Sequence, residues 1–205
     1  MHDIERCSMA VRKDDFIGRD RDDPTAVVNS LLFRFHMSSS MRKFRLVIIT
    51  GMPGTGKTTL AREAARSQGL PLICKDTIKE PLMDMLGASP SRSRELSNIS
   101  FAVMFSLARE LLAVGESLIL EGNFRAGEHE TPLRAAFPPD SPNIIQVLCR
   151  AQEHERRARI LQRSRHAGHQ DAHQLEPAAA CDAFLELPGE RHLYRVGFDS
   201  CETLF

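Results

Sequence analysis

Two patterns of hydrophobic and polar positions alternate along most of the chain. Short runs of aliphatic and β-branched residues predict strands at 46–49, 71–74, 117–121, 144–149 and 193–198. Longer stretches with apolar residues at helical spacing predict helices at 60–67, 78–86, 94–114 and 151–163. The first run is apolar at every position, which is typical of a strand buried on both faces of a parallel sheet. The alternation predicts an α/β fold, a five-stranded parallel sheet with helices on both faces.

The first 42 residues follow neither pattern. They carry a dense mixture of charges at 19–23 and a serine run at 38–40, a composition typical of a poorly ordered segment. Apolar residues at 26–35 favour one short helix within it. We expect an N-terminal arm over 1–42 and one domain over 43–205. A translation start placed too far upstream, ahead of Met37 or Met41, would also produce such an arm.

Composition sets limits on partners and location. The 205 residues, 42% of them hydrophobic, suit one globular domain. The 27 basic and 27 acidic residues cancel, so we expect neither extended nucleic-acid binding nor attraction to an anionic membrane. Uninterrupted apolar runs are only a few residues long, and no membrane span is expected. Five widely spaced cysteines and a first segment without a signal pattern favour a reducing, cytoplasmic location.

A glycine-rich motif follows the first predicted strand. Residues 51–58 read Gly-Met-Pro-Gly-Thr-Gly-Lys-Thr, which matches the Walker A pattern between a strand and a helix. Main-chain N–H groups and the helix N-terminus would bind phosphates, Lys57 the β- and γ-phosphates, and the Thr58 hydroxyl Mg²⁺. The predicted ATP site comprises Gly51, Met52, Pro53, Gly54, Thr55, Gly56, Lys57, Thr58 and Thr59. The alternative is a glycine-rich turn that merely joins strand to helix.

Two carboxylates follow the second and third predicted strands. Asp76 follows the second strand, with Lys79 one helical turn later, at the edge where α/β sheets bind ligands. Asp76 would take the proton of an acceptor hydroxyl and Lys79 would hold the substrate. Alternatively, Asp76 only caps a helix that begins at Thr77. Glu121 ends the third strand in the manner of a Walker B acid and would support Mg²⁺, as an outer ligand.

Polar and basic residues that follow the later strands are further candidates. Asn123 and Arg125 would contact the substrate, unless they are ordinary solvated loop residues. Arg156, Arg159 and Arg163 share one face of a helix, where their repulsion would be offset by a triphosphate. We expect a lid around 150–173, with Arg159 and Arg163 as its catalytic arginines. A solvated helix face paired with glutamates is the alternative. His166 and His169 have no third ligand in evident reach, so no metal site is predicted there.

From about Lys43 the chain resembles the small P-loop kinases of the predicted-kinase group, whose relatives include polynucleotide 5′-hydroxyl kinase, chloramphenicol phosphotransferase and zeta toxin. The resemblance rests on segments 51–58, 75–79, 121–124 and 165–169. It implies a P-loop NTPase fold like that of nucleoside monophosphate kinases, with Asp76 as catalytic base and Arg159 or Arg163 on the phosphates. Ala167 stands where the family lid has proline, and the chain ends at Phe205, where relatives usually continue into another helix.

These features together predict an ATP- and Mg²⁺-dependent phosphotransferase that moves the γ-phosphoryl group to a hydroxyl of a small molecule or nucleotide. Lys57 and Asp76 would carry its catalysis. Two alternatives stay open from the sequence. One is a nucleotide-binding ATPase switch that acts through a protein partner. The other is a polynucleotide 5′-hydroxyl kinase, which would need a basic groove that the zero net charge does not favour.

Overall fold

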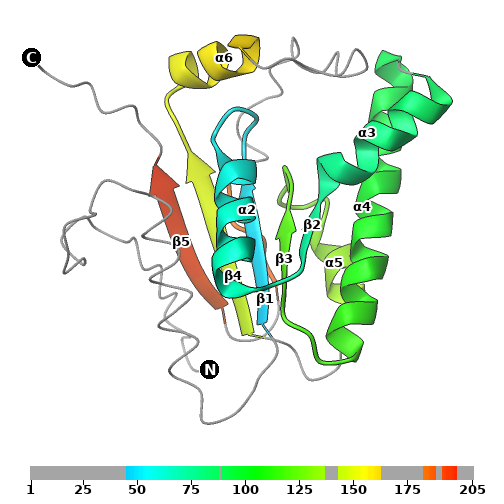
Figure 1. Cartoon of the computed structure of the whole chain (residues 1–205), viewed down its shortest axis with the longest axis vertical. Coiled ribbons are helices and arrows are strands. Elements are labelled where there is room, and N and C mark those ends of the chain that lie inside the picture. The colour runs from blue at the N-terminus through cyan, green and yellow to red at the C-terminus, as the bar shows by residue number, and fades with distance from the viewer. Residues whose placement is uncertain (1–44, 88, 137–142, 163–181, 188–190, 198–205) are drawn as a thin grey trace, which may run out of the picture.

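The computed structural model describes residues 45–87, 89–136, 143–162, 182–187 and 191–197 (Figure 1). Its strands are β1 (Arg45–Gly51), β2 (Leu72–Cys74), β3 (Leu118–Glu121), β4 (Asn143–Arg150) and β5 (Arg191–Gly197). They form one sheet in the order β2-β3-β1-β4-β5, and each neighbouring pair is parallel. The predicted five-stranded parallel sheet is confirmed, and each strand overlaps its predicted range.

Helices cover both faces of this sheet, as predicted. They are α2 (Lys57–Gln68), α3 (Lys75–Leu86), α4 (Pro90–Ala113), α5 (Glu130–Ala135) and α6 (Glu153–Gln162). Figure 1 shows α2 in front of the sheet, with α4 and α5 behind and to the right of it. Helix α5 was not predicted, because six residues are too few for a helical period to stand out. The predicted helix at 26–35 and the lid beyond residue 162 lie outside the described residues.

Side chains alternate between two hydrophobic cores along the central strand β1. Leu46 and Ile48 pack with the inner face of α4, whereas Val47 and Ile49 pack with α2. All four side chains are fully buried. This two-sided burial is why the strand is apolar at successive positions rather than at every second one. Because β1, β2 and β3 are parallel, their carboxyl ends lie at one edge of the sheet.

Helix α4 is the longest of the described helices. Its residues Ser91–Ala113 have the length and hydropathy of a membrane span. One side of the helix, however, contributes Phe101, Met104, Phe105 and Leu112 to the core beneath the sheet. Core packing therefore explains the apolar character of that side, as in the buried helices of many globular domains.

A buried glutamine ties the segment 182–187 to the sheet. Gln146 on β4 is fully buried, donates from Nε2 to the carbonyl of Leu185 (2.9 Å) and accepts from its N–H (2.8 Å). Leu185 and Leu187 join the same core as α4. The amide thus satisfies two main-chain groups that otherwise would be buried without partners.

We expect Gln146→Met to lower the free energy of unfolding by about 2–4 kcal/mol, because it leaves the N–H and the carbonyl of Leu185 unpaired at nearly constant side-chain volume. Urea denaturation measures the change. Gln152→Met, at an exposed position before α6, is the matched control. A loss below about 0.5 kcal/mol for the Gln146 variant would contradict this account of the segment.

Candidate active site

The loop between β1 and α2 has room for glycine alone at two positions. A Cβ atom on Gly51 (φ +145°) would lie 2.3 Å from the carbonyl oxygen of Cys149 at the end of β4. A Cβ on Gly54 (φ +82°) would lie 2.7 Å from the carbonyl oxygen of Arg156 in α6. Both φ values are also unfavourable for residues that carry a side chain. The loop is therefore packed tightly between β4 and α6.

Polar groups inside the loop converge on one carbonyl. Thr55 donates from Oγ1 to the oxygen of Met52 at 2.8 Å, and Lys57 donates from Nζ to the same oxygen at 3.4 Å. Pro53 and Thr59 lie at the surface. Among the described residues no side chain caps α2 at Gly56, so the first turn keeps N–H groups for a ligand. The loop thus has the donors that a phosphate chain requires.

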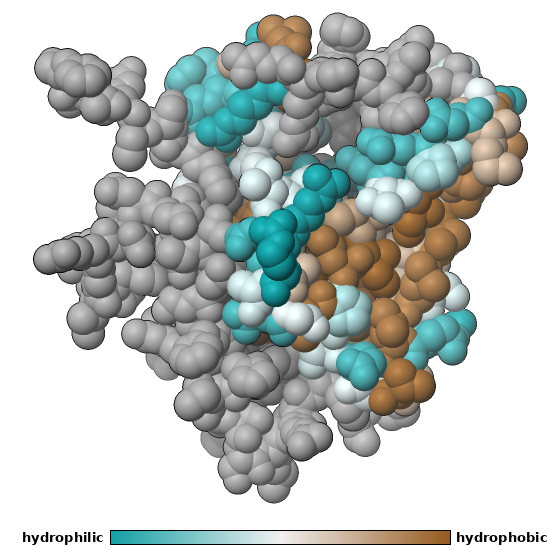
Figure 2. Space-filling view, in the orientation of Figure 1, coloured by the Kyte–Doolittle hydropathy of each residue, from teal (hydrophilic) through white to brown (hydrophobic). Residues whose placement is uncertain are grey.

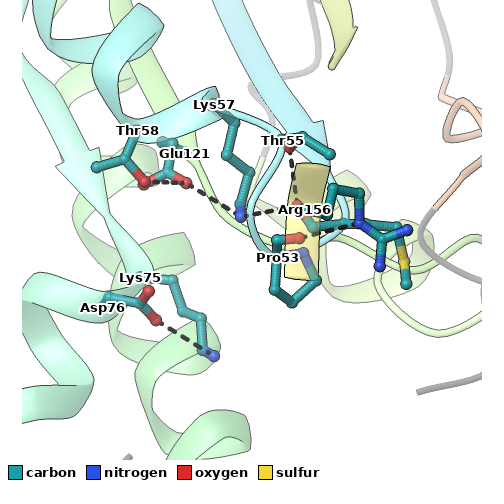
Figure 3. A network of polar contacts seen from close by, with 9 residues as sticks. Pro53, Thr55, Lys57, Thr58, Lys75, Asp76, Glu121 and Arg156 are labelled. Carbon is teal, nitrogen blue, oxygen red and sulfur yellow. Dashed lines mark hydrogen bonds and ion pairs between the residues drawn. The ribbon is translucent and has the colours of Figure 1, made fainter. Parts of the chain in front are cut away.

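Glu121 lies at the centre of the site, beside the end of the loop (Figure 3). Its Oε1 accepts a hydrogen bond from Thr58 Oγ1 (3.2 Å) and is 4.0 Å from Lys57 Nζ. The side chain is only 2% exposed. Burial raises the pKa of this carboxyl above its usual range, and the positive charge of Lys57 opposes the rise. The Glu121 carboxylate attracts a cation and the Lys57 ammonium attracts an anion. The pair therefore suits a ligand that carries both charges.

A thiol on the neighbouring strand also contacts Glu121. Cys74 pairs with Glu121 in the register of β2 and β3, and the two side chains are hydrogen-bonded. Burial is the main reason why the pKa of the Cys74 thiol rises to about 12, with the negative charge of Glu121 adding to it. The thiol is therefore protonated and can help to orient the carboxylate. Nothing in the residues around Cys74 singles it out, because its contact with Glu121 depends on strand register.

Asp76 lies in the first turn of α3, at the same edge of the sheet. Helix α3 begins at Lys75 with Cys74 as its N-cap, so the alternative that Asp76 caps a helix beginning at Thr77 is wrong. The Asp76 side chain is half exposed. Its charge raises the pKa of Glu121, so the two carboxylates share one electrostatic environment. A ligand in solvent can thus reach Asp76 at this edge of the sheet.

Lys75 is a site residue that the sequence analysis passed over. Its Nζ is 3.5 Å from Asp76 Oδ1 and 5.8 Å from the ring centre of Phe101, with the side chain 8% exposed. Burial lowers the pKa of Lys75, and the positive charges of Lys79 and Lys57 lower it further, against the effect of Asp76. Only burial distinguishes this lysine from an ordinary surface residue, and burial cannot be read from the local sequence.

The predicted substrate residues lie at different depths. Lys79 is fully buried and donates to Ser93 Oγ at 2.8 Å, between α3 and α4. Arg125 donates from Nη1 to Glu128 at 3.2 Å in the loop after β3. Asn123 is half-buried in the same loop. Lys79 therefore lies between two helices, whereas Arg125 and Asn123 lie in the loop that follows β3.

Two arginines of α6 reach the phosphate loop. Arg156 donates from Nε to the carbonyl of Pro53 (3.1 Å), as Figure 3 shows, and is buried. Arg159 donates from Nη1 to the carbonyl of Gly54 (3.3 Å) and is one third exposed. The predicted catalytic arginines are Arg159 and Arg163 rather than Arg156. In the structure Arg156 fastens α6 to the loop, whereas Arg163 lies outside the described residues.

The residues at this edge fit a magnesium ion bound with a triphosphate. The described residues contain no group of three or more histidine, cysteine, aspartate or glutamate side chains that would hold a metal ion alone. Thr58 and Glu121 instead bring a hydroxyl and a carboxylate oxygen together at 3.2 Å. Mg²⁺ in kinase sites is held by few protein oxygens together with substrate phosphates, which matches this donor set.

Fold and site together define a class of protein. A parallel sheet with a Walker A loop after its central strand, and acids at the ends of two neighbouring strands, is the arrangement of a kinase-like P-loop NTPase. Comparison with known families agrees. Residues 46–187 match the model of the AAA domain family, and the chain belongs to that family.

Known proteins similar to the chain support the same class. An uncharacterised protein of Mycobacterium tuberculosis is 31% identical over an alignment of 147 residues that covers 68% of this chain and 29% of that protein. This chain therefore spans less than a third of that relative's length. The crystal structure of a "putative kinase" from Chloroflexus aurantiacus has 30% identity and a TM-score of 0.68, covering 80% of this chain and 93% of that one.

A second solved structure supports the fold alone. The sugar kinase from Janibacter sp. HTCC2649 has a TM-score of 0.50 at 18% identity, covering 77% of this chain and 85% of that one. These findings confirm the predicted P-loop kinase-like fold and the resemblance to the small P-loop kinases.

A buried histidine behind the site gives a pH-dependent prediction. His129 Nδ1 accepts the N–H of Arg125 at 2.8 Å, its ring centre is 4.0 Å from that of Phe101, and burial lowers its pKa. As the pH falls below about 6.5, His129 is therefore protonated in the unfolded chain before it is protonated in the folded protein. We expect the free energy of unfolding to decrease from there until the folded-state pKa is passed.

Urea denaturation between about pH 7.5 and 5 measures this loss. His129→Phe keeps a ring in place without a titrating group, and we expect a smaller decrease over that window. His154→Phe, at an exposed position in α6, is the matched control. Equal slopes for the His129 variant and the wild type would contradict the assignment.

Proposed function

We propose that the protein is an ATP- and Mg²⁺-dependent phosphotransferase that moves the γ-phosphoryl group of ATP to a hydroxyl of a small molecule or nucleotide. One observation supports this most strongly. Asp76, a half-exposed carboxylate, shares an electrostatic environment with Glu121, whose carboxylate is 4.0 Å from the Walker lysine Lys57. At this edge of the sheet Asp76 would serve as the base and Lys57 as the phosphate-binding cation.

The proposed residue roles follow from these positions. Lys57 would exchange the carbonyl of Met52 for the β- and γ-phosphate oxygens, while the N–H groups of the loop and of the first turn of α2 bind the same chain. Thr58 and Glu121 would hold Mg²⁺, which when bound neutralises phosphate charge. Arg159, next to the loop, would contact the transferring group.

Asp76 would act on the acceptor. It accepts the proton of the acceptor hydroxyl as the oxygen of that hydroxyl bonds to the γ-phosphorus and the bond to the leaving ADP breaks. Lys75, 3.5 Å away, would keep that carboxylate charged and oriented. Lys79 stays a predicted substrate residue, although its burial against Ser93 favours a role in joining α3 to α4. The cytoplasmic location likewise stays a prediction.

Incubation of the protein with a metabolite extract and γ-labelled ATP, followed by mass spectrometry, tests the reaction. A phosphorylated product and ADP release that rises with that acceptor are expected. Slow ADP release that no hydroxyl compound in a broad panel increases would contradict the kinase and favour the ATPase switch. Salt-sensitive binding to single strands, with transfer to their 5′ ends, would instead favour the polynucleotide kinase.

Two variants should separate binding from chemistry. Lys57→Ala should weaken ATP binding by about 10- to 100-fold, the value of a charged hydrogen bond to phosphate. Asp76→Asn should leave ATP affinity nearly unchanged and lower turnover by ~10²-fold or more. Calorimetry and steady-state kinetics measure the two effects. Asp84→Asn, exposed on α3, is the matched control. Equal loss of binding in both variants would contradict the roles.

Lys75→Met should move the acid limb of the pH–rate profile to higher pH, because a carboxylate that loses a neighbouring positive charge is easier to protonate. The profile of kcat/KM for the acceptor measures this, and Lys75→Arg should restore the wild-type limb. An unchanged limb in Lys75→Met, with turnover equal to wild type, would show that the lysine only fills space.

A further inference from the structure

Helix α4 exposes an apolar stripe on the side away from the core. Ile99, Val103 and Leu107 are between 39% and 46% exposed. Their spacing of four residues places them along one side of the helix. Figure 2 shows hydrophobic atoms, in brown, gathered over α4 on the right of the molecule.

The core does not account for this stripe. The core-facing residues of α4, such as Phe101 and Phe105, lie on the other side of the helix. From Leu96 to Ala108 the sequence contains no charged residue, so even the outward positions of these turns are uncharged. A surface helix ordinarily carries charges on its outer face, and contiguous exposed apolar surface marks an interface.

Charged residues at the two ends of the stripe have a complementary order. Arg92 and Glu95 precede it, and Arg109 and Glu110 follow it; all four are exposed. Within one chain Arg109 and Glu110 form an exposed ion pair at 3.3 Å, which is weak enough to exchange for contacts with a second copy. Arg92 and Glu110 are 18 positions apart, or five turns of about 3.6 residues, so they lie on one line of the helix. Glu95 and Arg109, 14 positions apart, lie near one another around the helix in the same way. Each base at one end of the stripe therefore lies on nearly the same line of the helix as an acid at the other end.

We propose that two copies of this chain associate through α4, with the two helices antiparallel. A twofold axis beside residues 101 and 102 brings Arg92 of one copy to Glu110 of the other, and Glu95 to Arg109. Ile99 then lies opposite Val103 of the second copy. Each of these contacts occurs twice, as in any isologous interface. A parallel pairing would instead place like charges opposite one another.

The patch continues onto the end of α3. Met85 and Leu86 are 82% and 52% exposed, and Arg92 Nη1 donates to the carbonyl of Leu86, so this end lies beside the first turn of α4. A stable dimer buries about 800 Å² per partner, more than a single stripe of a helix supplies. The end of α3 adds to that area, and the expected product is a reversible dimer.

Sedimentation equilibrium of the full chain over a concentration series tests the pairing. The wild type should show a monomer–dimer equilibrium, and Val103→Glu should weaken it at least ~30-fold, because it buries an unpaired carboxylate at the centre. Leu161→Glu, an equally apolar exposed position on α6, should not change it. Thermal unfolding of the variants shows that the fold is intact, so the test is independent of the phosphotransferase.

An exchange of charges distinguishes this geometry from other dimers. Glu95→Arg alone and Arg109→Glu alone should each weaken the dimer about tenfold, and the double variant should restore it. The two residues are about 21 Å apart along one helix, so restoration can arise only between copies. A wild type that is monomeric throughout, a dimer insensitive to Val103→Glu, a double variant without restoration, or vesicle binding by a monomer would each overturn the proposal.

Discussion

Close contact between main-chain segments decides the shape of the site. Gly51 meets the carbonyl of Cys149 and Gly54 meets that of Arg156, at distances that a Cβ atom could not occupy. The first contact follows from the sheet order, because β4 is the parallel neighbour of β1 and Cys149 is the register partner of Gly51. The phosphate loop is thus shaped by the sheet on one side and by α6 on the other, before any ligand is present.

The electrostatic interactions of the site depend on how the phosphate loop packs against the sheet. The loop directs Lys57 towards Glu121, and the adjacent strand brings Cys74 to the same carboxylate. Because Glu121 and Lys75 are buried, each is held away from its usual protonation equilibrium, upward for the acid and downward for the amine. Groups in this condition gain most from a ligand that brings its own charges, as a magnesium triphosphate does. A bound magnesium triphosphate would therefore supply the charges that stabilise the ionised forms of Glu121 and Lys75.

The sequence predicted the fold well where a pattern repeats. The strands stood out as short aliphatic runs, and the Walker loop combined a fixed spacing with a strand and a helix on either side. Sequence patterns predicted less where the role of a residue depends on its burial or on a tertiary contact. The burial of Lys75 and Lys79, the contact between Cys74 and Glu121, and the anchoring of α6 by Arg156 all arise from tertiary packing. Helix α5 was missed because six residues give no measurable period.

Calorimetric titration with magnesium ATP and with adenosine tests the central claim most directly. If the loop from Gly51 to Thr58 binds the phosphate chain, ATP should bind at one site per chain and adenosine should give little or no heat. No binding of magnesium ATP, or equal affinity for the nucleotide and the nucleoside, would contradict the account.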